Sequence, residues 1–104
     1  MKILIHGATG RMGKTLIRLM EKNPEQYEFA AGISPEYEET NEKQFLSLQD
    51  CRAEAEMVID FSNHAATEAL LSYCLERKLP AVICTTGQTP EEKEMIRQAA
   101  LQIP

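Results

Sequence analysis

The chain has 104 residues, a formal net charge of −5 and a hydrophobic fraction of 43%. This length favours one domain with a single core, and an acidic chain without a basic stripe is a poor candidate for binding nucleic acid or an anionic membrane surface. No apolar stretch approaches the ~20 residues that a membrane-spanning helix needs.

The cysteines and histidines indicate neither disulfides nor a metal site. Cys51, Cys74 and Cys84 form no CxxC pair and are odd in number, which is typical of reduced thiols in a cytoplasmic protein. His6 and His64 lack cysteine or carboxylate partners at ligand spacing, so we predict no metal.

The first third of the chain predicts a strand, a helix and a second strand. The apolar run Lys2–His6 is the first strand, and helical spacing of apolar residues predicts a helix over Arg11–Lys22. The predicted apolar face consists of Met12, Leu16, Leu19 and Met20. Asn23-Pro24 ends this helix, and Tyr27–Ile33 is the second strand.

The middle of the chain begins with a polar loop. Ser34–Glu42 is rich in glutamate, and we expect a short helix over Lys43–Leu48 anchored by Phe45 and Leu46. Glu56–Phe61 is then the third strand. Its apolar centre is unbroken by polar residues, as expected for a parallel strand that is covered on both faces.

The last part predicts a helix, a strand and a helix. Ser62 can cap a helix over about His64–Arg77, and Ala81–Cys84 is the fourth strand. Thr89-Pro90-Glu91-Glu92 predicts a capping box at the start of the final helix. The residues expected to be buried are Ala66, Ala69, Leu70, Tyr73 and Cys74 in the first helix and Met95, Ile96, Ala99 and Ile103 in the second.

This succession of strands and helices predicts an α/β fold. It implies a Rossmann-like domain of three layers, with right-handed crossovers joining about four parallel strands. Ligands of such folds bind at the carboxyl ends of the strands. The residues that we expect at those ends are Gly7–Gly13, Ser34, Asp60–Ser62 and Cys84–Gly87.

The glycines at the end of the first strand have the spacing G-x-x-G-x-x-G. Gly7 allows a tight turn, Gly10 lets the backbone approach a pyrophosphate, and Gly13 permits close packing of helix on strand. The unpartnered N–H groups at the start of the helix make this turn a ready phosphate site.

A P-loop nucleotide triphosphatase is a competing interpretation. Ala8–Thr15 differs by one substitution from G-x-x-x-x-G-K-[ST], and Met57–Asp60 resembles a strand that ends in a magnesium ligand. That scheme leaves Gly7 and the Thr85–Gly87 turn without a role.

Three motifs in this order support a more specific interpretation: His6–Gly13, Val58–Ser62 and Thr85–Gly87. Together they resemble the amino-terminal domain of 4-hydroxy-tetrahydrodipicolinate reductase, also called dihydrodipicolinate reductase, over essentially the whole chain. The resemblance implies an oxidoreductase of lysine and diaminopimelate biosynthesis. Such an enzyme uses NADH or NADPH to reduce 4-hydroxy-tetrahydrodipicolinate, a cyclic dicarboxylate, to tetrahydrodipicolinate, typically as a cytoplasmic homotetramer.

The resemblance also implies cofactor-binding residues but no catalytic or metal-binding ones. Gly7 to Met12 would hold the pyrophosphate, with Arg11 adding a cation and Met12 packing on the cofactor. The nicotinamide end would be lined by Cys84, Thr85 and Thr86. The full set is Gly7, Ala8, Thr9, Gly10, Arg11, Met12, Ser34, Cys84, Thr85 and Thr86.

Three positions depart from the family pattern. Ser34 stands where many members have an acid for the ribose, and serine suits either a hydroxyl or a 2′-phosphate, so NADH versus NADPH is open; the glutamates that follow, Glu36 among them, are predicted to face water. Cys84 replaces a glycine and could narrow the nicotinamide pocket. His64 replaces a common proline and is predicted to be a solvated histidine at a helix end.

The sequence finishes at Ile103-Pro104, where a fifth strand should follow. We therefore expect residues 1–104 to be the NAD(P)-binding part of an enzyme, lacking the carboxy-terminal substrate domain and inactive alone. Two further interpretations stay open. One is a protein like the short-chain dehydrogenases, although no Tyr-x-x-x-Lys pair is present, and the other is a non-catalytic module that senses a dinucleotide.

Overall fold

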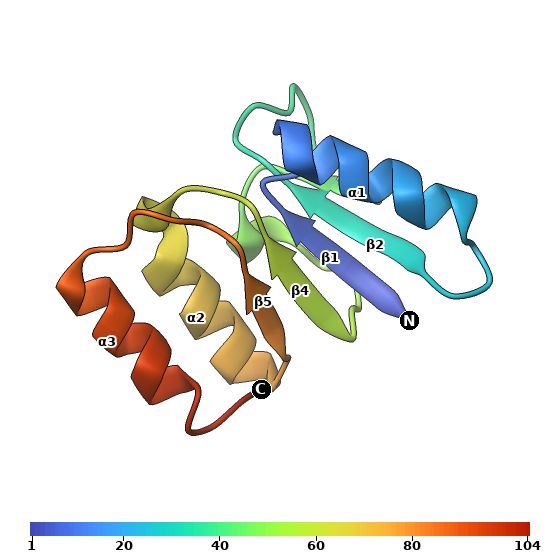
Figure 1. The fold of residues 1–104 in the computed structure, drawn as a ribbon. Helices are drawn as coiled ribbons and strands as arrows, with labels where there is room; N and C mark the ends of the chain where they lie inside the picture. Colours follow the sequence, from blue (N-terminus) through green and yellow to red (C-terminus); the bar gives the residue numbers. More distant parts are fainter.

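Five parallel strands form one sheet in the computed structural model, which describes all residues 1–104 (Figure 1). In sheet order they are β3 (Gln44–Phe45), β2 (Glu28–Ile33), β1 (Lys2–His6), β4 (Met57–Asp60) and β5 (Ala81–Ile83). The change of direction lies between β1 and β4, where open α/β sheets bind ligands. This confirms the predicted α/β class and adds one short strand.

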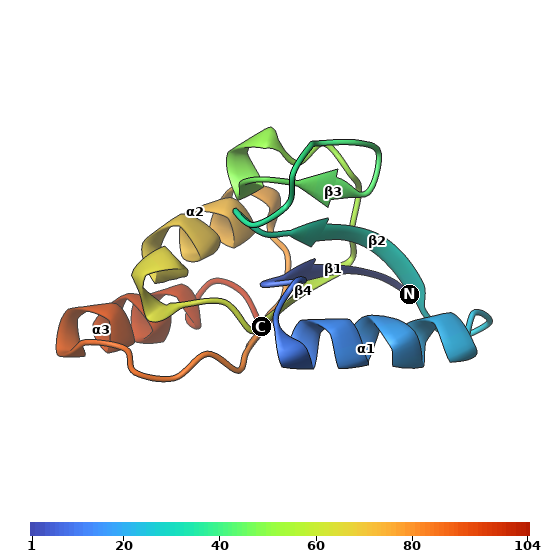
Figure 2. The same ribbon diagram turned by 90° about the horizontal axis from the view of Figure 1, so that it is seen from above.

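Helices cover both faces of the sheet. Figure 2 shows α1 (Arg11–Lys22) on one face and α2 (Thr67–Arg77) on the other, which gives the three predicted layers. The last helix, α3 (Pro90–Ala99), packs beside α2. None of the three helices has the length and apolar character needed to span a bilayer.

Successive side chains of a strand point to opposite faces, so β1 contributes to two cores. Leu4 and Val58 belong to the core under α2, whereas Ile3 and Ile5 belong to the core under α1. The larger core also contains Ala31, Ile33, Phe45, Leu48, Cys51, Leu70, Tyr73, Cys74 and Ile103. Burying each large side chain contributes about 1.5–3 kcal/mol.

The face that α1 buries differs from the prediction. Met12 and Leu19 are 55% and 52% exposed, and the buried positions are Gly13 and Met20, with Leu16 and Ile17 of α1 half-buried between them. The reason is that the helix meets the sheet through Gly13. Counting from this glycine, the contact residues follow i, i+3, i+4 and i+7, so the true face is rotated from the predicted one.

The predicted helix over 43–48 is wrong. Gly32 N donates to Lys43 O at 2.8 Å and Ser34 N donates to Phe45 O at 3.0 Å, so this segment pairs with β2 as strand β3. A 3₁₀ helix, Leu48–Asp50, follows it. Phe45 is buried as expected, but Leu46 is 38% exposed.

The start of α2 also differs, because Ser62 does not cap it. Asn63 Oδ1 accepts from Ala65 N at 2.9 Å, and a 3₁₀ turn, His64–Ala66, precedes the helix. Three of the residues predicted to be buried are buried: Leu70, Tyr73 and Cys74. Ala66 is half-buried and Ala69 is exposed. Lys78, in the left-handed region, ends the helix.

The capping box of α3 is confirmed. Thr89 Oγ1 accepts from Glu92 N, and Glu92 Oε1 accepts from Thr89 N at 2.8 Å. The buried stripe is shorter than predicted, because Ala99 and Ile103 are buried while Met95 is 37% exposed.

Both chain ends lie at the amino-terminal edge of the sheet. The Met1 ammonium donates to Gln26 O at 3.0 Å, just before β2. Pro104 O accepts from Ala81 N, the first residue of β5, at 3.1 Å. Figure 1 shows both ends on this side, away from the start of α1.

Two glycines let α1 approach the strands closely. Gly7 has a φ of 87°, and a Cβ there would lie 2.5 Å from the carbonyl oxygen of Phe61, at the end of β4. A Cβ at Gly13 would overlap the Gly7 carbonyl and the Ala8 backbone. Both positions therefore require glycine for packing reasons alone.

We predict that Gly13→Ser lowers the free energy of unfolding by about 1–3 kcal/mol through overpacking, although replacing a helical glycine normally stabilises. The matched variant is Gly10→Ser, at the N-cap of α1, where a Cβ meets only Gly7 O at 3.5 Å. Serine is a favourable N-cap, so this variant should be at least as stable as the unsubstituted chain. Urea unfolding followed by circular dichroism measures both, and equal stability of the two variants would contradict the packing role of Gly13.

Candidate functional site

The loops that follow β1, β2, β4 and β5 lie together at the carboxyl-terminal edge of the sheet (Figure 1). These loops, with the first turn of α1, carry all the site residues predicted from the sequence. These are the glycine turn Gly7–Met12, Ser34, and Cys84 with the threonines that follow it. The topology therefore brings together segments that are far apart in the chain.

The glycine turn is hydrogen-bonded to the end of β2. Gly7 N and Ala8 N both donate to Ile33 O, at 2.9 and 3.1 Å, and Gly10 N donates to Gly7 O at 3.2 Å. These bonds use three of the four backbone donors between β1 and α1 and direct the start of that helix along the edge of the sheet.

The amino terminus of α1 is left open. Its N-cap, Gly10, has no side chain, no acidic residue lies in the first turn, and the N–H groups of Arg11 and Met12 have no partner in the chain. At the start of α3, by contrast, Thr89 and Glu92 supply the missing acceptors. Unpartnered N–H groups at a helix start carry partial positive charge, so α1 offers a place for an anion.

Gly10 fits this purpose. Unlike Gly7 and Gly13, it has ordinary φ and ψ values of −74° and 170°, and its Cβ would be accommodated within the chain. Glycine is therefore not required there by packing. It leaves the helix start bare, so that a phosphate can approach the N–H groups closely. The neighbouring side chains of Arg11 and Met12 are exposed.

Ser34 is buried at the end of β2, and its hydroxyl is already engaged. Ser34 Oγ and Thr9 Oγ1 share a hydrogen bond of 2.6 Å, and Ser34 Oγ accepts from Glu36 N at 3.1 Å. Glu36 reaches back to the turn, since Thr9 Oγ1 donates to its carboxylate at 3.4 Å. The Glu36 side chain is exposed, as predicted from the sequence, and its carboxylate also lies beside the glycine turn.

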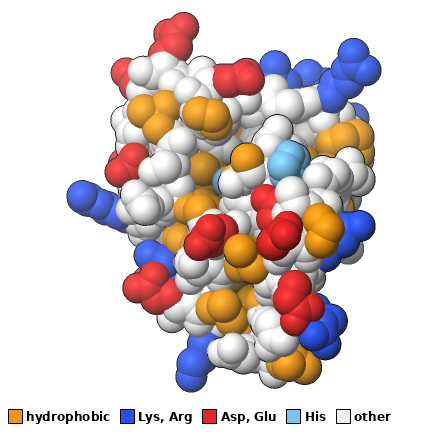
Figure 3. Space-filling view, turned by 90° about the vertical axis from the view of Figure 1, so that its left-hand side faces the viewer, with side chains coloured by type: hydrophobic (Ala, Val, Ile, Leu, Met, Phe, Trp, Pro, Cys, Tyr) orange, Lys and Arg blue, Asp and Glu red, His pale blue; other side chains and the backbone are white.

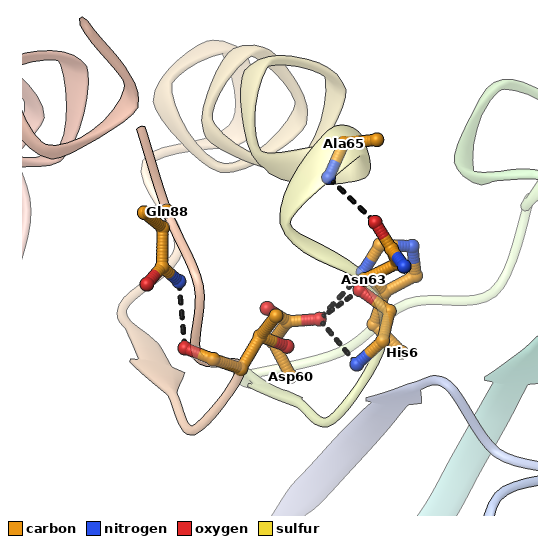
Figure 4. A network of polar contacts seen from close by, with 7 residues as sticks. His6, Asp60, Asn63, Ala65 and Gln88 are labelled. Atoms are coloured by element: carbon orange, nitrogen blue, oxygen red, sulfur yellow. Dashed lines mark hydrogen bonds and ion pairs between the residues drawn. The ribbon is translucent and has the colours of Figure 1, made fainter. Parts of the chain in front are cut away.

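A buried pair joins the ends of β1 and β4. His6 and Asp60 are register partners, and His6 Nδ1 donates to Asp60 Oδ1 at 2.9 Å (Figure 4). Ser62 adds two further donors, its N–H at 3.1 Å and its hydroxyl at 2.5 Å. Three donors on one carboxylate oxygen hold the turn after β4 in place.

These bonds determine the ionisation of Asp60. Burial raises the pKa of the carboxyl, but the hydrogen bonds from His6 and Ser62, with the nearby Thr85 hydroxyl, outweigh it and hold the pKa below its usual range. The carboxylate thus contributes stability that is present above its unfolded-state pKa and is lost as the pH falls through the folded one.

The loop after β5 carries the remaining predicted residues. Cys84 and Thr86 are exposed. The Thr85 hydroxyl is buried beside Asp60 but makes no well-formed hydrogen bond, while Thr85 O accepts from Gln88 Nε2 at 2.6 Å (Figure 4).

His64 is only partly the solvated residue predicted from the sequence, because its side chain is 39% exposed but is also paired. His64 Nδ1 donates to Glu92 Oε1 at 2.8 Å, so the histidine is bound to the start of α3. The sequence could not indicate this pair, because its members are 28 residues apart.

A groove opens beside His6 on the α2 side of the sheet. It lies between α2, along the length of that helix, and residues 46–49, and its lining includes Pro35, Ala65 and Tyr73. The side of the molecule that carries α3 has acidic, basic and hydrophobic side chains interspersed, without a continuous basic patch (Figure 3).

The features of a P-loop do not come together. Lys14 is exposed on α1, and the Thr15 hydroxyl donates to Arg11 O of its own helix at 3.0 Å. Asp60 is engaged by His6 and Ser62, and nowhere in residues 1–104 do three His, Cys, Asp or Glu side chains gather as metal ligands do.

Comparisons with known proteins agree on one family. Residues 1–104 match the family model described as "Dihydrodipicolinate reductase, N-terminus". The 4-hydroxy-tetrahydrodipicolinate reductase of Caldanaerobacter subterraneus subsp. tengcongensis is 37% identical over 103 residues, covering 99% of this chain and 41% of the relative. Those of Clostridium tetani and Xylella fastidiosa are 33% and 34% identical, covering 99% and 100% of this chain and 40% and 46% of the relatives.

Among solved structures, the fold matches a dipicolinate-bound dihydrodipicolinate reductase from Paenisporosarcina sp. TG-14. The TM-score is 0.76 with 21% sequence identity, over 97% of this chain and 42% of that one. The chain thus spans about two fifths of the length of the relatives it matches. On the match to the family model, which extends from Met1 to Pro104, the chain belongs to the dihydrodipicolinate reductase family and corresponds to its amino-terminal part.

Proposed function

We propose that residues 1–104 bind NADH or NADPH for the reduction of 4-hydroxy-tetrahydrodipicolinate to tetrahydrodipicolinate in lysine and diaminopimelate biosynthesis. The observation that carries this proposal is the open start of α1, with unpartnered N–H groups and a bare Gly10, at the ligand-binding edge of a parallel sheet. We further propose a cytoplasmic homotetramer; the three cysteines, all free thiols, suit a reducing compartment.

In this scheme the pyrophosphate lies against the turn Gly7–Met12. The N–H groups of Arg11 and Met12 donate to it, and the exposed Arg11 guanidinium adds a positive charge. Met12, whose apolar side chain is exposed, packs on the cofactor. Family membership makes a dinucleotide the better fit than a nucleoside triphosphate.

We place the adenosine half of the cofactor by the end of β2, next to the groove that includes Pro35 and Ala65. Ser34 shapes this region rather than contacting the ribose, because its hydroxyl is engaged by Thr9 and Glu36. The Glu36 carboxylate can accept from a ribose 2′-hydroxyl and would repel a 2′-phosphate, so we propose that NADH is preferred.

The nicotinamide half then lies by Cys84, Thr85 and Thr86. When bound, the nicotinamide supplies the hydride that the reduction consumes. The Thr85 hydroxyl, which lies beside Asp60 without a well-formed hydrogen bond, can bond to the ring's amide when the cofactor is bound. The chain's share of the reaction is therefore to bind and orient the cofactor, and the dicarboxylate is the substrate of the whole protein.

Gly10→Val should weaken NADH binding at least tenfold, about 1.4 kcal/mol, because a branched side chain would occupy the space of the pyrophosphate. Thr15→Val puts the same side chain one turn along α1, on an exposed position, and should leave the Kd unchanged. Calorimetric titration with NADH measures both variants. Unaltered NADH binding by Gly10→Val, or binding of ATP with magnesium and no dinucleotide, would contradict the proposal.

Removing the Glu36 charge should shift cofactor preference. We expect Glu36→Gln to tighten NADPH binding relative to NADH by about fivefold, the loss of roughly 1 kcal/mol of repulsion at a solvated site. Glu38→Gln, an equal charge change in the same exposed loop, is the control. The ratio of the two Kd values is the measurement, and an equal ratio in both variants would exclude Glu36 from the ribose site.

Bound NADH should also protect Cys84 from alkylation. Cys84 is the exposed cysteine, whereas Cys51 and Cys74 are 4% and 0% exposed, and burial raises the pKa of Cys74 to about 11. N-ethylmaleimide should therefore modify one thiol in the folded chain and three in urea. Saturating NADH should slow the modification of Cys84 about threefold or more. Mass spectrometry measures the rate of this modification. An unchanged rate would place the nicotinamide elsewhere.

A further inference from the structure

His64 and Glu92 connect two loops at the ligand-binding edge. His64 begins the 3₁₀ turn that follows β4, and Glu92 lies in the first turn of α3, which follows β5. The bond of 2.8 Å between Nδ1 and Oε1 joins them across 28 residues of sequence. Figure 1 shows the two loops at the same end of α2 and α3.

The same carboxylate oxygen also holds the backbone where α3 begins. Glu92 Oε1 accepts from Thr89 N at 2.8 Å as well as from His64. The hydrogen bond from the Thr89 N–H, and then that from His64, lower the pKa of Glu92. One group thus fixes both the end of the β5 loop and its distance from the turn after β4.

Besides the Thr85 hydroxyl, which is buried beside Asp60, few groups restrain the loop between β5 and α3. Cys84 N donates to Asp60 O at 2.9 Å at its beginning, but residues 85–88 make no backbone–backbone hydrogen bond. The bond from Gln88 Nε2 to Thr85 O is internal to the loop. The His64 ring lies close to Gly87, since a Cβ at that glycine would be 3.8 Å from the ring carbon Cδ2.

We propose that His64 is a positioning residue for the nicotinamide half of the cofactor, acting through Glu92 on the Thr85–Gly87 turn. This inference rests on the proposed function, because it takes that turn as the nicotinamide site. It assigns no contact between His64 and the cofactor. The glycine turn after β1 is held by its own bonds to Ile33, so the pyrophosphate site is independent of His64.

Because the pyrophosphate site and the nicotinamide site are held independently, two ligands can test the proposal. NADH should use both the glycine turn and the Thr85–Gly87 turn, whereas ADP-ribose, which lacks nicotinamide, should use only the former. We expect His64→Leu to weaken NADH binding about five- to tenfold and to change the Kd for ADP-ribose by less than about twofold. His64→Asn, which retains an N–H donor near the position of Nδ1, should restore NADH binding to within about twofold.

A second pair of variants tests the carboxylate. Glu92→Gln keeps an acceptor but removes the charge that strengthens the bond to His64, and it should weaken NADH selectively, by about threefold. Glu91→Gln removes the same charge from the same helical turn without touching His64, and it should bind both ligands normally. Melting temperatures should change little, because the pair is only part-buried and such ion pairs near the surface contribute little to stability. If the His64→Leu variant does not fold, Glu92→Gln provides the test: selective weakening of NADH relative to ADP-ribose supports the proposal, and its absence contradicts it.

Calorimetric titration of the full 104-residue chain with both ligands separates the outcomes. Unchanged NADH binding by His64→Leu, or equal weakening of NADH and ADP-ribose, would overturn the role of His64 while leaving the proposed function intact. If the unsubstituted chain binds neither ligand, the proposed function itself fails and this inference fails with it.

Discussion

The close contact between the Gly7 backbone and the Phe61 carbonyl is the constraint on which the rest of the site depends. It needs both a positive φ and the absence of a Cβ, two conditions that only glycine meets together. Because the chain turns there within one residue, α1 starts at the edge of the sheet rather than beyond it. Gly13 then lets the helix lie against the turn. A larger residue at either position would displace the helix start from the other loops.

Around this contact, a buried charge holds the neighbouring strands. An ionised carboxylate in the interior is costly unless it is hydrogen-bonded, and His6 with Ser62 supplies three donors to one oxygen of Asp60. In sequence this carboxylate resembles the magnesium ligand of a nucleotide triphosphatase. In the fold its role is structural, because it holds the turn after β4. The same division holds along the whole edge, where His6, Ser34 and Asp60 are buried and Arg11, Met12 and Thr86 are exposed.

Local signals predicted most of the fold. Apolar runs located four strands, and the Thr89–Glu92 box located the start of α3, because each depends on residues a few positions apart. The failures depend on distant partners. The two-residue strand β3 exists through its pairing with β2, and Asn63 caps in place of Ser62 because Asp60 engages that serine. Nor does a local signal indicate that the exposed Glu36 lies beside the glycine turn, because that contact depends on the path of its loop.

The position of the two termini has a practical consequence. Met1 and Pro104 both lie at the edge of the sheet from which the strands start, and the five residues of β1 separate that edge from the glycine turn by about 16 Å. A support surface, a fluorophore or a fused protein attached at either end would lie at the amino-terminal edge of the sheet, opposite the candidate site. Immobilised and free chains should thus present the same open face to a molecule in solution.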